Sequence, residues 1–180
     1  MLISKFSEID KDSVEAYEDK LSLKLPNQFR SFILKYNGGE TPNTSFKIGK
    51  ESSDVKAFYG LGNVKYSLDK VSPLEINGKR YLPIALDSFG NEVVIDVKDG
   101  SISFLNHENG KVVSLTDDFG SFIKACESAP ISKGAVKSVE EREKDLIAKG
   151  RGSIITDALR DMWRAEIAKY SNIALEEVVL

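Results

Sequence analysis

The sequence contains few of the residues from which metal and redox sites are built. It has one cysteine, Cys126, and one histidine, His107, among 180 residues. A structural zinc site needs four such ligands, so these two residues cannot form one. A single cysteine cannot make an intramolecular disulfide, and the apolar surroundings of this one, FIKACESA, indicate a buried structural thiol. We therefore predict no metal site and no cofactor.

An excess of positive charge and long apolar runs are also absent. Lysine and arginine number 25 against 28 aspartates and glutamates, which gives a net charge of -3. Such a chain has no basic field to neutralise a phosphate backbone, so we expect no direct nucleic-acid binding. No apolar run approaches the ~18 residues that cross a bilayer, and the beginning, MLISKFSEIDKD, lacks the apolar core of a signal peptide. We expect a soluble, cytoplasmic protein that does not bind membranes.

Catalytic motifs are equally scarce. The chain has no GxSxG nucleophile pattern, and His107 lies in a turn segment, LNHENGK. The GLG at 60–62 lacks the Lys-Ser or Lys-Thr of a phosphate loop. The central carboxylates lack calcium-loop spacing and are interpreted as turn caps or solvated groups: Asp87, Glu92, Asp96 and Glu108. We predict a non-enzymatic protein without catalytic residues. The alternative is a small hydrolase that uses His107 with Glu108 or Asp87.

Two helical patterns open the chain. Asp12 and Glu15 have the spacing of a capping box, which predicts a helix over 12–21. Pro26 suits the first turn of a second helix, whose apolar residues share one face: Phe29, Phe32, Ile33 and Tyr36. Asn37, Gly38 and Gly39 follow at once and predict its end, because these residues tolerate left-handed backbone.

Residues 40 to 116 have the period of a sheet. Six strands are predicted, near 45–49, 55–59, 79–84, 92–97, 101–105 and 111–115, with a helical turn at 66–71. Asn77-Gly78, Asp99-Gly100 and Asn109-Gly110 are typical of the tight turns that join antiparallel strands. We expect the helix that contains Phe29 and Phe32 to cover the apolar face of this sheet. The fold class is therefore α+β, with a central, mainly antiparallel sheet of about six strands flanked by helices.

The last third of the chain is predicted to be helical. A third helix over about 118–128 closes a domain of residues 1–130, and a helical C-terminal extension covers 131–180. A linker over 129–137 leads to a capping box, Ser138 and Glu141, which begins a charged helix to about 148. A final helix begins near Thr156 or Asp157 and carries an apolar stripe with the only tryptophan, Trp163. This stripe packs on the sheet or on helix 12–21, or it forms a homodimer or partner contact.

Three segments taken in order resemble the SUKH superfamily, the Smi- and Knr-like proteins. They are LPNQFRSFILKYNGG at 25–39, YLPIALDSFGNEVVIDVKDGSISFLNHEN at 81–109 and DDFGSFI at 117–123. The likeness spans about residues 4–128 and implies an α+β fold without established catalytic chemistry. Bacterial members act as immunity proteins that bind a cognate toxin, often a nuclease domain. The fungal branch includes a regulator of cell-wall synthesis.

The resemblance also marks the positions of the shared motif. Outside the candidate site these are Leu25, Pro26, Pro83, Ile84, Ala85 and Gly90. The motif and partner-binding candidates are Asn37, Gly38, Gly39, Asp87, Asn91, His107 and Glu108. Each also has a structural interpretation, since glycines permit positive φ and Asp87 with Asn91 can tie a turn. Leu105 replaces the aromatic that family members often place before the His-Glu pair. The hypothesis is an immunity protein that neutralises a toxin by stoichiometric binding, and the alternative is a regulatory scaffold of the cell-wall synthesis type.

Overall fold

The computed structural model describes residues 1–130, 137–171 and 173–180. The chain forms two compact units, which we describe separately: Met1–Ala129 with Leu175–Leu180, and Pro130–Ala174. The elements in chain order are β1 (Leu2–Lys5), α1 (Lys11–Leu21), α2 (Asn27–Tyr36), β2 (Gly39–Glu40), β3 (Thr44–Ile48), β4 (Glu51–Asp54), β5 (Ala57–Phe58), η1 (Leu68–Lys70), β6 (Leu74–Ile76), β7 (Lys79–Leu86), β8 (Glu92–Asp96), β9 (Ile102–Leu105), β10 (Val112–Thr116), α3 (Phe119–Ala125), β11 (Cys126–Ser128), α4 (Val139–Ala148), η3 (Gly152–Ile154), α5 (Asp157–Ser171) and β12 (Glu176–Glu177).

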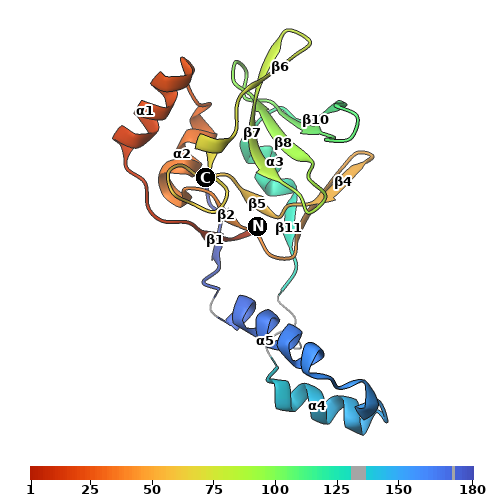
Figure 1. The fold of residues 1–180 in the computed structure, drawn as a ribbon. Helices are drawn as coiled ribbons and strands as arrows, with labels where there is room; N and C mark the ends of the chain where they lie inside the picture. The colour runs from red at the N-terminus through yellow and green to blue at the C-terminus, as the bar shows by residue number, and fades with distance from the viewer. Residues whose placement is uncertain (131–136, 172) are drawn as a thin grey trace. The chain divides into compact units, whose positions relative to one another are not determined.

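The first unit is built on an antiparallel sheet (Figure 1). Its strands follow the order β10-β9-β8-β7-β5-β2-β1-β12, with β6 paired to β7, and a smaller sheet has the order β11-β3-β4. All three predicted hairpin connections are present, but only Asn77-Gly78, between β6 and β7, is the predicted two-residue turn. Asp99-Gly100 lies in the longer connection 97–101 between β8 and β9, and Asn109-Gly110 lies in the connection 106–111 between β9 and β10. The α+β class and the mainly antiparallel sheet are therefore confirmed, but the main sheet has nine strands instead of about six.

Aromatic rings join the helices to the sheet. Phe32 of α2 lies with its ring centroid 5.2 Å from that of Phe58 on β5 and 5.2 Å from that of Phe119 on α3. Phe122 of α3 is 5.5 Å from Phe46 of β3, which links the smaller sheet to the same core. All five rings are buried. The prediction that the helix with Phe32 covers the sheet is confirmed.

One predicted helix cap and one predicted helix end are wrong. Asp10, not Asp12, caps α1, because its carboxylate accepts a hydrogen bond of 2.7 Å from the Ser13 amide. The third helix ends at Ala125 and not at residue 128. Residues Cys126–Ser128 leave the helix because they pair with β3 as strand β11. The first error comes from a choice between two aspartates, and the second from a pairing with residues about 80 positions away, between Cys126 and Phe46.

The end of the chain returns to the first unit. Strand β12 pairs with β1, where Glu177 lies opposite Leu2. The Leu2 amide donates to Ser128 Oγ at 2.8 Å, so the chain leaves the first unit and re-enters it beside the same residue. Val178 is buried in the core, and the Val179 amide donates to Tyr36 Oη at 2.9 Å. The last six residues of the predicted extension over 131–180 therefore belong to the first unit.

The second unit is a helical hairpin of α4 and α5. The predicted capping box is confirmed, since Ser138 Oγ accepts from the Glu141 amide and the Glu141 carboxylate accepts from the Ser138 amide. Arg142 of α4 pairs with Glu166 of α5 at 2.6 Å. The Arg142 guanidinium also lies 5.8 Å from the Trp163 ring centroid. Most of the predicted linker, 131–136, lies outside the described residues. The packing of the α5 apolar stripe on the sheet, on α1 or in a homodimer stays a prediction.

Candidate functional site

Asp87 fixes the turn between β7 and β8. Its side chain is buried, and its Oδ1 accepts hydrogen bonds from the amides of Phe89 and Asn91, each at 2.8 Å. Its Oδ2 accepts from Asn91 Nδ2 at 2.7 Å and from Ser53 Oγ of β4 at 2.8 Å. The predicted turn tie between Asp87 and Asn91 is thus present. Burial opposes ionisation, but the hydrogen bonds from Asn91, Ser53 and the two amides outweigh it and hold the pKa of Asp87 below its ordinary value.

Asn91 extends this tie to the turn between β9 and β10. Its Oδ1 accepts from the His107 amide at 3.1 Å and lies 3.0 Å from His107 Nδ1. An amide oxygen only accepts, so this contact requires the proton on His107 Nδ1. Asn91 stands between Asp87 and His107, so the carboxylate and the imidazole form no direct dyad. The Glu108 amide donates to Asn106 Oδ1 at 3.0 Å, while the Glu108 side chain is exposed.

The turn between β7 and β8 carries an exposed aromatic ring. Phe89 lies between Asp87 and Asn91 and is 71% exposed. Its neighbour Ser88 is held from the other side, because Ser88 Oγ donates to Asp54 Oδ2 of β4 at 2.6 Å. We define the braced face as the surface made by five residues of these segments: Asp54, Ser88, Phe89, His107 and Glu108. The Phe89 and His107 amides of this face are fixed by hydrogen bonds to the buried side chains of Asp87 and Asn91, and the exposed side chains of the face are available for contact.

Asn37, Gly38 and Gly39 lie at a different place. Asn37 ends α2 with φ of 49° and is buried, and its side chain exchanges hydrogen bonds with the Leu61 backbone. Gly38 has φ of 72°, and a Cβ there would lie 2.6 Å from the carbonyl oxygen of Phe58. Only glycine fits such a close backbone approach. These residues hold the end of α2 against the chain after β5, and no hydrogen bond among the described residues joins them directly to Asp87, Asn91 or His107.

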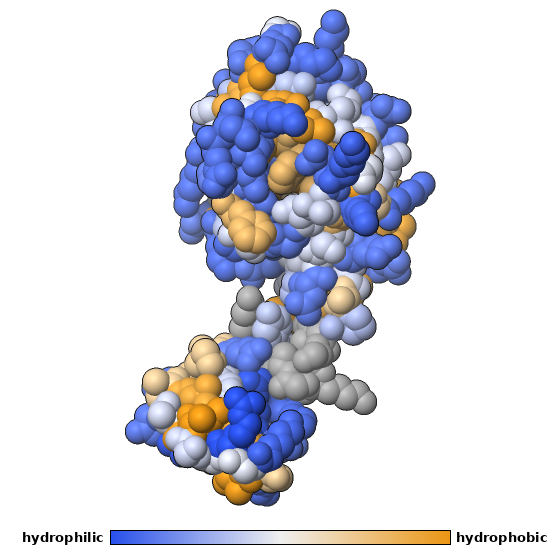
Figure 2. All heavy atoms as spheres, turned by 90° about the vertical axis from the view of Figure 1, so that its right-hand side faces the viewer, coloured by the Kyte–Doolittle hydropathy of each residue, from blue (hydrophilic) through white to orange (hydrophobic). Residues whose placement is uncertain are grey.

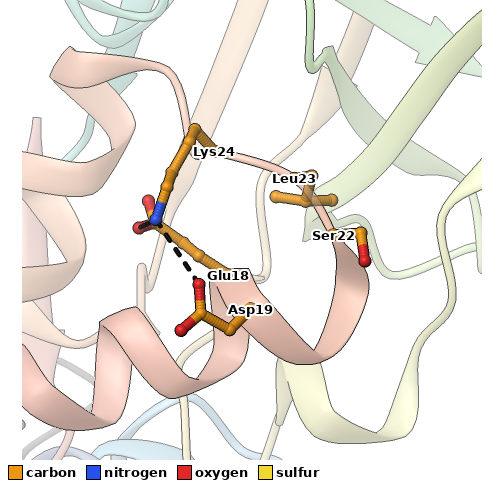
Figure 3. A pocket seen from close by; sticks show the side chains of 5 residues that line it. All are labelled: Glu18, Asp19, Ser22, Leu23 and Lys24. Atoms are coloured by element: carbon orange, nitrogen blue, oxygen red, sulfur yellow. Dashed lines mark hydrogen bonds and ion pairs between the residues drawn. The ribbon is translucent and has the colours of Figure 1, made fainter.

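Sequence reasoning missed Glu18, the buried carboxylate beside the Leu-Pro motif. Its Oε1 accepts from the Leu25 amide at 3.0 Å, and its Oε2 pairs with Lys24 Nζ at 3.1 Å. Arg30 Nε of α2 lies 3.3 Å from the same carboxylate. Burial raises the pKa of Glu18, but these hydrogen bonds and cations bring it below its ordinary value. Figure 3 shows Lys24 reaching between Glu18 and Asp19 in a shallow pocket at the end of α1.

The Glu18 pocket is best explained as a structural joint. Its charged groups are already paired with one another, and its carboxylate ties α1 to the residues before α2. A glutamate on an otherwise polar helix gives no local signal of burial, because the neutralising cations come from elsewhere in the chain. Ser53 was missed for the same reason, since its partner Asp87 lies 34 residues away.

The remaining reactive groups do not meet at the braced face. Cys126 is buried in β11, and burial raises the pKa of its thiol to about 12, which agrees with a structural role. Within the described residues, no group of three or more His, Cys, Asp or Glu side chains could hold a metal ion. No helix among the described residues is long and apolar enough to cross a membrane.

Comparison with known proteins identifies the family. The chain is 27% identical over 120 residues to the SPbeta prophage-derived uncharacterized protein YokK of Bacillus subtilis (strain 168), a match that covers 54% of this chain and 62% of that relative. A family model described as SUKH_6, SMI1-KNR4 cell-wall, matches residues 11–123. That range contains α1, α2 and most of α3, together with the Asp87 turn and His107. The chain therefore belongs to the SUKH_6 family of SMI1-KNR4 proteins.

Proposed function

We propose that this chain is a non-enzymatic, cytoplasmic immunity protein that neutralises a cognate toxin by stoichiometric binding. The observation that carries the proposal is the family match over residues 11–123. SUKH proteins of bacteria, which the motif order resembles, act in this way. The family is generally without catalytic activity, and the polar motif residues of this chain are engaged in holding backbone turns. A protein of this kind acts by occupying a surface of its partner.

The braced face is the proposed contact surface. Phe89 is an aromatic side chain held outward by a turn whose backbone is already fixed, so its contact with a partner would require little further ordering. Aromatic residues often supply much of the binding energy of an interface. His107, whose ring lies beside Gly90, and Glu108 are exposed polar groups of the same face. We therefore assign Phe89 as the anchor and the neighbouring polar side chains as the rim of the contact.

The charge of the first unit favours a basic partner. Its residues include 16 Lys and Arg against 21 Asp and Glu, whereas the second unit has 9 against 7. Opposite potentials speed the encounter between two proteins and lose this effect as salt rises. A nuclease domain exposes basic residues where it binds its phosphate substrate. The proposed partner is accordingly a toxin with a basic surface, and its association rate should fall as ionic strength increases.

Co-expression with the toxin domain encoded by the neighbouring gene tests the proposal. We expect growth rescue and a co-purified complex, and we expect Phe89→Ala to weaken binding at least about tenfold. Val179→Ala is the matched control, because Val179 is 59% exposed and lies away from the braced face. Absence of both rescue and complex would contradict the function. Normal binding by Phe89→Ala would contradict only the assigned face.

The stoichiometry of protection separates binding from catalysis. A binding inhibitor neutralises at most one toxin molecule per molecule of immunity protein. Residual toxin activity should therefore fall linearly as immunity protein is added and reach its minimum at a ratio of one to one. Inactivation of a large molar excess of toxin, if it is abolished by His107→Ala, would instead support the hydrolase alternative.

The description of the family model, SMI1-KNR4 cell-wall, favours a second candidate. In this alternative the chain is a regulatory scaffold of the cell-wall synthesis type. Recovery of wall enzymes or kinases with the purified chain, in a host that encodes no adjacent toxin gene, would support it over the immunity function.

A further inference from the structure

The outer side of α4 carries a stripe that the hairpin itself does not cover. The side chains of α4 that turn toward α5 are partly buried: Val139, Arg142, Glu143 and Leu146. Glu140, Lys144 and Ile147 are exposed, and their spacing of four and three residues places them on one face of the helix. Ile147 is the apolar residue of this face and is 61% exposed. We call these three residues the outer α4 stripe.

This stripe belongs to a unit with very little core. Trp163 is the only buried residue among the described positions of 137–174. Ile154, just after the turn, is 44% exposed, and Figure 2 shows apolar side chains gathered on the surface of this smaller unit. Two helices bury only the seam between them, and a unit of this size is marginal without further apolar burial. The open side of α4 is therefore suited to contact with another helix.

The charges along α4 indicate which helix that is. The helix begins with Glu140 and Glu141 and is followed by Lys149 and Arg151. The ion pairs found among the described residues of this unit involve Lys137, Arg142, Arg160 and Arg164. Lys144, Lys149 and Arg151 take part in none of these pairs. When two copies of α4 lie antiparallel, the acidic start of each meets the basic end of the other. A two-fold axis makes both contacts equivalent, so the helix is complementary to itself.

We propose that a second copy of this chain covers the outer α4 stripe, in a symmetric dimer with the two α4 helices antiparallel. Ile147 packs near the two-fold axis, against the aliphatic stem of Lys144 of the partner subunit. Glu140 pairs with Arg151 of the partner subunit, and the symmetry repeats the pair. The two hairpins then share one helical interface, and the dimer carries two first units.

The mass of the full chain in solution tests this assignment. Light scattering after size exclusion and sedimentation equilibrium should give a dimer with a Kd below about 100 μM. Ile147→Asp and Glu140→Lys should each raise that Kd at least about tenfold, because each substitution occurs twice at the interface of a symmetric dimer. The double variant Glu140→Lys with Arg151→Glu should restore the dimer, since it recreates both pairs with the charges exchanged.

Two controls keep the result specific. Met162→Asp alters a residue of α5 that is 60% exposed, so it matches Ile147→Asp in chemistry but lies on the other helix, and it should leave the dimer intact. The fluorescence of Trp163, the only tryptophan, reports whether the hairpin of each variant is folded. A chain that stays monomeric at about 100 μM overturns the proposal. A dimer that responds to Met162→Asp and not to Ile147→Asp, or that the double variant fails to restore, overturns the assigned interface.

Discussion

The two units bury their apolar residues to very different extents. The first unit encloses a continuous core in which Phe32, Phe58 and Phe119 contact one another and are almost fully buried. In the second unit, Trp163 is the one buried side chain among the described residues. Burial of apolar surface is the main favourable term in folding. The first unit therefore derives its stability from its core, and the second depends on helix caps, ion pairs and whatever covers it.

The two units also differ in how deeply their polar side chains are buried. In the first unit Asp87, Glu18 and Asn37 are buried, and each is satisfied by several hydrogen bonds that fix a turn or a helix end. In the second unit the charged residues form partly or fully exposed pairs, such as Arg164 with Asp161. Exposed pairs contribute roughly 0–1 kcal/mol, whereas removal of one partner from a buried group costs more. Buried polar residues thus shape the first unit, and exposed ones only support the second.

The largest expected effect is the loss of an aromatic ring from the core of the first unit. Phe32→Ala should reduce the free energy of unfolding of this unit by about 3–5 kcal/mol, because it removes a fully buried ring and leaves a cavity. Chemical denaturation followed by circular dichroism measures the loss. Trp163 fluorescence, which reports the second unit, should change little. An equal shift of both signals would show that the two units unfold together and would end the comparison between them.

Replacement of the buried carboxylate should have the next largest effect. Asp87→Asn keeps the shape of the side chain but loses charge-assisted hydrogen bonds, and we expect a loss of about 2–3 kcal/mol at pH 7. Asp117→Asn, at an exposed position, is the matched control. The loss should be measured by denaturant unfolding at several pH values. A difference below about 0.5 kcal/mol between Asp87→Asn and the control would contradict this role.

The pH dependence of that difference has a defined sign. The folded pKa of Asp87 lies below its ordinary value of 3.8, so its ionised form stabilises the folded state. This contribution is complete above about pH 3.8 and is lost as the pH falls through the lower folded pKa. The wild type and Asp87→Asn should therefore become more similar in stability as the pH decreases below 4. A difference that grows on acidification would contradict the assignment.

Local patterns were sufficient where local chemistry decides the structure. The helix with Phe29 and Phe32 follows from its apolar spacing, and its left-handed end at Asn37 follows from the residue types. Strands β7 to β10 lie within a few residues of the predicted ones, because their apolar alternation matches a sheet with a buried face. The two-residue turn at Asn77-Gly78 also follows from its residue types, because both residues tolerate positive φ.

Apart from the α1 cap, the errors and omissions arise from pairings that local sequence does not encode. Strand β4 is polar, Glu-Ser-Ser-Asp, and exists because β3 lies beside it. Strand β12 is two glutamates that pair with the beginning of the chain. The braced face was predicted only in part: Asp87, Asn91 and His107 came from the family motif, but the exposure of Phe89 and the support from Ser53 depend on the folded arrangement.

A cap on the second unit should have a smaller, local effect. Ser138→Ala removes the side chain that accepts from the Glu141 amide and should reduce the stability of the hairpin by about 1 kcal/mol. Thermal unfolding followed by Trp163 fluorescence measures it, while the circular-dichroism transition of the first unit should stay in place. Ser153→Ala, an exposed serine in η3, is the control. If the cap had no effect, the hairpin would owe its stability to burial against a covering surface.

The smallest expected effect on stability belongs to Phe89. Phe89→Ala and Phe32→Ala both remove a phenyl ring, but the Phe89 side chain is 71% exposed and therefore has little buried surface to lose. The free energy of unfolding should change by less than about 0.5 kcal/mol. The turn should keep its shape, because Asp87 and not the ring holds its backbone. Denaturant unfolding measures the change. A loss above about 1 kcal/mol would mean that the ring packs on its own unit in solution, and an aromatic that is already covered has no apolar surface left with which to anchor a toxin.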